Sequence, residues 1–267
     1  MAQWKAIVDG SSSVSKQQRI LVVSSQFLTN YRNVHSLDNT RKLIEQFDMV
    51  DHYLDLRSDP FEDLKEQLED GLRWDNGSGS PWILWNAGDL NASSRQMDLL
   101  EAVLGSHCSP TAVGPLMLLM SLPGSASVAY RRDISTVANW SVWDSHSATC
   151  LSESVKTLGH MNQIRQHSVP LYTNRLPGCR KEPSTSKTNN YIYRSIGNIT
   201  LLERFYPRRH RYLTVVNLQA SNLTVDLSTS YYGGQVLLSS SGAKQGYLQL
   251  NALQLEPAEG LLLLLDK

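Results

Sequence analysis

The sequence predicts an α/β region followed by an all-β region. In the first two thirds of the chain, short apolar runs alternate with amphipathic helical patterns, which is typical of a parallel sheet with crossover helices. Residues 182–190 are polar and turn-rich, and beyond them short β runs are separated by turns. We therefore predict two domains, residues 1–181 and 182–267.

Composition excludes some functions. The chain has 267 residues, of which 41% are hydrophobic, so it can bury a large core. Lysines and arginines number 25 and are balanced by 25 acidic residues. Because no long-range positive field would attract a phosphate backbone, we expect no nucleic-acid partner.

Four strands are expected in the first region. Residues 19–25 are apolar without alternation, as in a strand covered on both faces. The next strands are predicted over 49–56, 82–86 and 126–130. Helices are expected between them, and four strands with three crossovers indicate half of an eight-stranded βα barrel.

Helix signals support this order. Ser36 can cap a helix through Phe47, and Asp59 can cap one that has Pro60 in its first turn and Gly71 as its terminator. Helices are also predicted over 97–104 and 115–120. A last amphipathic helix has its apolar face made by Leu151, Val155, Leu158, Met161 and Ile164.

No membrane span or leader is predicted. The charge-free stretch 102–130 exceeds the ~20 residues that cross a bilayer, but Pro110, Pro115 and Pro123 interrupt it, which favours a buried helix and a strand. Lys5 and Asp9 lie where a signal peptide has its apolar core.

The all-β region is predicted to be an antiparallel sandwich. Its strands are expected at 191–195, 199–205, 212–218, 223–227, 235–238, 247–255 and 261–265.

Cysteines and asparagines bear on the compartment. The three cysteines, Cys108, Cys150 and Cys179, show no metal spacing, and either three free thiols or a Cys150–Cys179 disulfide fits the pattern. Five Asn-x-Ser/Thr motifs favour a glycosylated, extracellular surface. They begin at Asn76, Asn91, Asn139, Asn198 and Asn222.

Specific residues carry a family resemblance. The run Ser121-Leu122-Pro123-Gly124-Ser125 resembles the Leu-Pro-Gly motif near the eighth strand of α-amylase-family barrels, and 82–89 resembles the seventh strand. The run 248–263, with 212–217, is similar to the C-terminal part of amino-acid transporter heavy chains of the 4F2 cell-surface antigen type. The second match is the more specific, and the likeness spans nearly the whole chain.

This resemblance implies the C-terminal half of an α-amylase-like (β/α)8 TIM barrel, strands five to eight, followed by the sandwich. It implies a plasma-membrane protein with its domains on the extracellular face, partnered by a multi-pass transporter light subunit. Membrane contact would come from an N-terminal segment outside this chain.

The resemblance also implies that the family's catalytic groups are replaced. The family's proton-donating acid aligns with Ser24 or Ser25, and its His-Asp pair with Ala87 and Gly88. A serine hydroxyl is no substitute for a carboxylic acid near neutral pH. Asp89 is either a displaced remnant or an ordinary loop residue. We therefore expect no glycosidase activity.

Other chemistries find no support. The sequence has no nucleophile elbow, phosphate-binding glycine loop or zinc helix, so we expect no cofactor or metal. His160 and His167 are too far apart in sequence to chelate one ion as an i, i+4 pair would. The basic run 207–211 is either a solvated hairpin tip or a contact for lipid headgroups or an acidic partner.

Three functions remain from these observations. The leading one is a non-catalytic ectodomain that helps an amino-acid transporter reach the plasma membrane and remain stable there. The alternatives are a fragment of an α-glucosidase or amylase-family hydrolase and a sugar-binding module, for which Trp82 and Trp85 are the candidate platforms.

Overall fold

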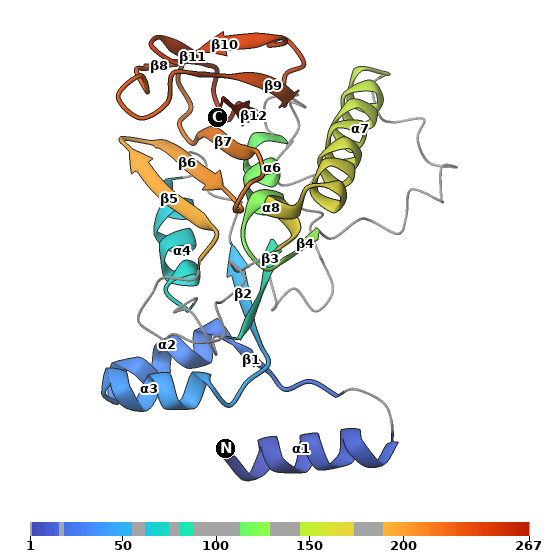
Figure 1. Ribbon diagram of the computed structural model, residues 1–267, viewed down its shortest axis with the longest axis vertical. Coiled ribbons are helices and arrows are strands. Elements are labelled where there is room, and N and C mark those ends of the chain that lie inside the picture. The colour runs from blue at the N-terminus through green and yellow to red at the C-terminus, as the bar shows by residue number, and fades with distance from the viewer. Residues whose placement is uncertain are drawn as a thin grey trace.

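The computed structural model describes residues 2–15, 19–54, 62–74, 81–87, 113–128, 145–173 and 189–266. Its first region contains a four-stranded parallel sheet in the order β1-β2-β3-β4, formed by Val22–Ser24, Met49–Leu54, Trp82–Ala87 and Ser125–Val128 (Figure 1). The strand order follows the chain order, as in one half of a βα barrel. The predicted parallel sheet is therefore confirmed.

The helices of this region lie before, between and after the parallel strands in sequence. They are α1 (Ala2–Ser15), α2 (Ser25–Val34), α3 (Leu37–Ile44), α4 (Glu62–Leu72), α6 (Gly114–Ser121), α7 (Ser145–His167) and α8 (Val169–Tyr172). No helix within the described ranges is both long and apolar enough to cross a membrane. The helix predicted over 97–104 lies outside the described residues, as do Asp59, Pro60 and the boundary segment 182–188.

The first strand is shorter than predicted. It ends at Ser24, and Ser25 already belongs to α2, a helix that the sequence pattern did not reveal. The physical reason is a cap: Ser24 has extended backbone angles, and its Oγ accepts a hydrogen bond from the Gln26 backbone N at 3.3 Å. Ser36 caps α3 in the same manner, as predicted, accepting from the Asn39 backbone N at 3.4 Å.

Gly71 does not terminate its helix. It lies inside α4, which ends at Leu72. A Cβ at this position would clash with the ring atoms of Trp85 and His52 on the sheet below. The glycine therefore permits a close helix–sheet approach, in place of the C-cap role that we expected.

The last long helix begins earlier than expected. α7 starts at Ser145, and only part of the predicted face is buried in it. Met161 is fully buried, whereas Val155 is exposed.

The second region is antiparallel, as predicted. One sheet has the order β10-β9-β12-β7-β6-β5, and a second sheet pairs β11 with β8. The strands are β5 (Tyr191–Ile196), β6 (Ile199–Arg204), β7 (Arg211–Asn217), β8 (Leu223–Val225), β9 (Gly233–Ser239), β10 (Tyr247–Gln249), β11 (Leu253–Leu255) and β12 (Gly260–Leu265).

The prediction of a single strand over 247–255 was wrong, because this segment forms two strands that belong to different sheets. β10 pairs with β9, and β11 crosses to pair with β8. Between them, Leu250 is buried against the second core, and its backbone N donates to the Tyr232 carbonyl at 3.2 Å. The alternation of apolar residues slips by one position between Ala252 and Leu253, so the sequence did carry a sign of the break that the single predicted strand ignored.

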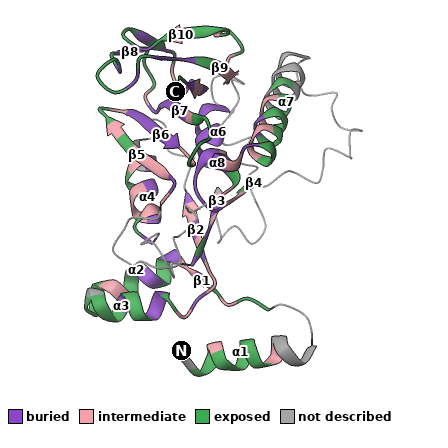
Figure 2. Cartoon of the chain, in the orientation of Figure 1, coloured by how far each residue is buried: buried purple, intermediate pink, exposed green. Residues whose placement is uncertain are grey.

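Two apolar cores flank the six-stranded sheet. The larger one combines Trp85 and α6 with Leu202, Val216 and Leu262 of that sheet. The other fills the space between the six-stranded and two-stranded sheets. Burial is densest where the two regions meet (Figure 2). A third, smaller cluster lies around Leu28, Phe47 and Val50.

A fully buried arginine joins the two regions. Arg204 of β6 donates from Nη1 to the Ser121 carbonyl (3.0 Å) and from Nε to the Pro170 carbonyl (3.1 Å). Its Nη2 reaches the Thr173 carbonyl at 2.5 Å. Ser121 is the last residue of α6, where the helix dipole favours a positive charge.

Candidate functional site

Barrel proteins carry their chemistry at the carboxyl ends of the parallel strands. In this protein those ends are Ser24, Leu54, Ala87 and Val128. Residues 55–61, 88–112 and 129–144, which follow three of the strands, lie outside the described part of the chain. The described strands themselves therefore define the candidate site.

Ser24 lies at the end of β1, where the resemblance placed the family's acid. Its hydroxyl accepts from the backbone of α2 and is thereby held as a helix cap. Ser25, the first residue of α2, is buried. The hydroxyl of Ser24 therefore has a structural role at this point of the fold.

The two faces of the parallel sheet differ in chemistry. Side chains of β2 alternate between buried (Val50, His52, Leu54) and half-buried (Met49, Asp51, Tyr53) positions. The buried face packs against α2 through Val50 and against α4 through His52 and Leu54. The half-buried face continues onto Ser24 in β1 and Asn86 in β3, which are paired in register with Asp51 and Tyr53.

Asp51 and Asn86 form a polar pair on this half-buried face. The Asn86 Nδ2 donates a short hydrogen bond to the Asp51 carboxylate. Burial raises the pKa of Asp51 above its ordinary value, and the hydrogen bond from Asn86 opposes this shift. A half-buried carboxyl with a raised pKa is a candidate proton donor.

Sequence reasoning missed Asp51 and Asn86. A signal was present, because a carboxylate inside the apolar run of a predicted strand is costly to bury without a partner. Asp51 is the single carboxylate on β1–β4 as described. Glycoside hydrolysis by the common mechanisms requires two carboxyl groups on either side of the bond.

The two candidate sugar platforms lie on opposite faces. Trp85 is fully buried, and its Nε1 donates to the Pro123 carbonyl at 2.6 Å, so it is unavailable to a sugar. Trp82 is 40% exposed on the half-buried face, and its Nε1 donates to Ser125 Oγ at 2.9 Å. Only Trp82 offers an open aromatic surface on the described sheet.

His52 is a buried base on the helix-covered face. Its Nε2 lies 2.8 Å from the Gln67 carbonyl, which can only accept, so this nitrogen carries the proton. Its Nδ1 has no hydrogen-bond partner among the described residues. Burial lowers the pKa of His52, and the ring meets Trp85 edge-on at 5.2 Å.

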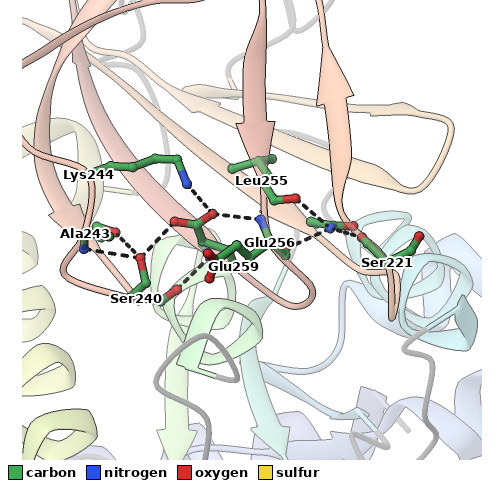
Figure 3. Close-up of polar contacts among 11 residues, drawn as sticks. Ser221, Ser240, Ala243, Lys244, Leu255, Glu256 and Glu259 are labelled. Atoms are coloured by element: carbon green, nitrogen blue, oxygen red, sulfur yellow. Dashed lines mark hydrogen bonds and ion pairs between the residues drawn. The ribbon is translucent and has the colours of Figure 1, made fainter.

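The buried carboxylate Glu259 serves the fold (Figure 3). It accepts from Lys244 Nζ (2.5 Å), Ser241 Oγ (2.9 Å) and the Glu256 backbone N (2.9 Å). These contacts close the turn before β12, and Gly114 of α6 packs so closely on this turn that it has no room for a Cβ. Because its hydrogen bonds tie the loop between β9 and β10 to the turn before β12, we assign Glu259 a structural role.

Several predicted residues lie outside the described ranges. They are Gly88, Asp89, Asn76, Asn91, Asn139, Cys108 and Cys179. Cys150 belongs to α7, but its possible partner Cys179 is not described, so the Cys150–Cys179 disulfide remains a prediction. Asn198 lies in the turn between β5 and β6, and Asn222 is exposed just before β8.

No metal centre is formed by the described residues. They contain no group of three or more His, Cys, Asp or Glu side chains arranged to hold an ion. His160 and His167 are both exposed on α7, and His167 Nδ1 lies 2.8 Å from the Gln163 carbonyl of its own helix.

Comparison with solved structures supports the architecture. An α-amylase from Anoxybacillus matches 99% of this chain and 56% of its own, with a TM-score of 0.51 and 11% identity. The fold is α-amylase-like. The isomaltulose synthase SmuA from Protaminobacter rubrum matches 76% of this chain and 46% of its own, with a TM-score of 0.47 and 9% identity.

The trehalulose synthase MutB from Pseudomonas mesoacidophila MX-45 matches the same shares, with a TM-score of 0.46 and 12% identity. This chain therefore spans about half the length of each of these three proteins. No protein-family model matches the sequence, and no curated protein matches it. The predicted partial barrel with a β domain is confirmed at the level of the α-amylase-like fold.

Proposed function

We propose that this chain is the non-catalytic ectodomain of an amino-acid transporter heavy chain. Its role would be to stabilise a multi-pass light subunit and assist its delivery to the plasma membrane, with the domains on the extracellular face. The observation that carries the proposal is Ser24. At the strand end where a family hydrolase presents its acid, this chain presents a hydroxyl committed to capping α2.

Two further features support the proposal. The parallel strands as described carry one carboxylate, Asp51, where hydrolysis requires a pair. The run 248–263, which resembles the transporter heavy chains, forms β10, β11 and most of the central strand β12. An accessory subunit needs a stable folded surface and no bond-breaking groups.

The test is co-expression with heteromeric transporter light subunits in cells that lack heavy chains. Surface biotinylation and amino-acid uptake are measured with and without this chain. The proposal predicts co-purification with a light subunit and a several-fold rise in its surface amount. No co-purification, together with an unchanged surface amount for every light subunit, would refute it.

A second candidate, a sugar-processing site, is favoured by the Asp51–Asn86 pair. A carboxyl with a raised pKa lies beside Asn86 on the same face as the exposed Trp82. Incubation with α-linked oligosaccharides distinguishes the candidates. Glucose release that disappears in Asp51→Asn, an isosteric change, would favour the hydrolase and exclude the accessory role as the sole function.

A further inference from the structure

The β6–β7 hairpin forms a small basic pocket that the proposed function does not use. The pocket has a volume of about 340 Å³. Three arginines, two aromatic side chains and one carboxylate contribute to its lining, namely Arg208, Arg209, Arg211, Phe205, Tyr206 and Asp266. This volume lies at the lower end of the ~300–1,000 Å³ range of small-ligand sites.

The arginines of this pocket outnumber the carboxylates near them. Three guanidinium groups stand against two carboxylates, Asp266 in the lining and Glu203 paired with Arg211, which leaves a formal charge of +1. Asp266 already accepts a hydrogen bond from the Tyr247 hydroxyl at 2.5 Å. Arg208 and Arg209 are exposed and make no ion pair within the described part of the chain.

Arg211 is held in position before any ligand arrives. Its Nη1 donates to the buried Glu203 carboxylate at 3.0 Å, and its guanidinium lies 6.0 Å from the centre of the Phe205 ring. The other Glu203 oxygen accepts from the Tyr231 hydroxyl at 3.0 Å. A guanidinium fixed in this way loses little conformational freedom when it binds an anion.

The tip of the hairpin is also shaped unusually. Arg208 has a φ of 60°, in the left-handed region that favours glycine. The turn is closed by the Arg209 backbone N, which donates to the Tyr206 carbonyl at 3.1 Å. An arginine at a backbone position that favours glycine indicates that its side chain has a use besides forming the turn.

We propose that this pocket binds a phosphate group carried on a small polar headgroup. A phosphate monoester carries a charge of about −1.5 to −2 at neutral pH and offers three strong acceptor oxygens. That charge is opposite in sign to the net positive charge of the lining, and planar guanidinium groups bind phosphate oxygens through paired hydrogen bonds. The remaining volume and the Phe205 and Tyr206 rings accommodate the group that carries the phosphate.

The phosphate can belong to a soluble ester or to a lipid headgroup, and binding assays on the full chain separate these sources. One assay is calorimetry at low salt with glucose phosphate and with inositol trisphosphate. The other is cosedimentation with phosphatidylcholine vesicles that contain or lack phosphatidylinositol phosphate. The test variant is R208Q/R209Q, and the control R41Q/K42Q removes the same charge from exposed positions on α3.

The proposal predicts that the wild-type chain binds at least one probe. The R208Q/R209Q variant should bind at least about tenfold more weakly, because two charge-assisted contacts are lost, while R41Q/K42Q binds as the wild type does. Binding to the soluble esters supports a free phosphate ligand, and binding to the vesicles alone supports a lipid headgroup. No binding to any probe, or equal loss in both variants, would overturn the phosphate site.

Discussion

Replacing Arg204 with methionine should destabilise the protein by about 3 kcal/mol. The buried guanidinium donates to the carbonyls of Ser121, Pro170 and Thr173. Asn190 Nδ2 also donates to the last two carbonyls, so they stay partly satisfied, whereas Ser121 loses its charged donor. A hydrogen bond to a charged group contributes roughly 1.5–3 kcal/mol, and removing a buried charge offsets part of the loss.

Urea denaturation followed by tryptophan fluorescence measures this change. A loss of about 3 kcal/mol corresponds to a Tm lower by roughly 6–12 °C for a protein of this size class. Arg194→Met is the matched control, because Arg194 is exposed on the neighbouring strand β5, and we expect it to shift stability by less than about 0.5 kcal/mol. If R204M lies within about 1 kcal/mol of the wild type, Arg204 does not join the two regions in the manner described.

Three further predictions concern other buried positions. Gly71→Ala should destabilise the protein by roughly 1–3 kcal/mol, since its methyl group would enter the Trp85 ring. Gly159→Ala, on the open face of α7, should stabilise it by up to about 1 kcal/mol. Thermal melts in which both variants shift the Tm in the same direction would contradict this. Burial lowers the pKa of His52 below its ordinary value of 6.5, so this residue binds fewer protons in the folded state than in the unfolded state. The contribution of His52 to stability is therefore present above pH 6.5 and is lost as the pH falls below 6.5. His52→Leu should flatten this slope in unfolding measurements across pH, and an unchanged slope would exclude His52 as its source. Glu259→Ala should cost about 2–4 kcal/mol by leaving Lys244 and the turn amide unpaired, and a loss below about 1 kcal/mol would show that the turn holds without it.

The sequence pattern predicted those elements whose burial is regular. Each of the four predicted parallel strands overlaps an observed strand, and so does each strand predicted after residue 190, although several ends differ and 247–255 covers two strands. It failed where a side chain's role depends on distant neighbours. Gly71 has the sequence context of a helix terminator, and only the position of Trp85 against α4 shows why the helix continues through it.

The candidate site was predicted less well than the fold. Ser24 was found because a family resemblance pointed to the end of β1, although its capping role depends on α2, a helix that was not predicted even though Phe27, Leu28, Tyr31 and Val34 have helical spacing. Asp51 and Asn86 are 35 positions apart in sequence, and their pairing follows from the strand register, which local patterns do not encode.

The position of β12 has a consequence for synthesis. This strand follows all the other described strands in sequence, yet it lies between β7 and β9 in the middle of the six-stranded sheet. Until it emerges from the ribosome, two neighbouring strands present unpaired edges that invite aggregation. A truncation that removes β12 would therefore leave both β7 and β9 without a partner in the centre of the sheet.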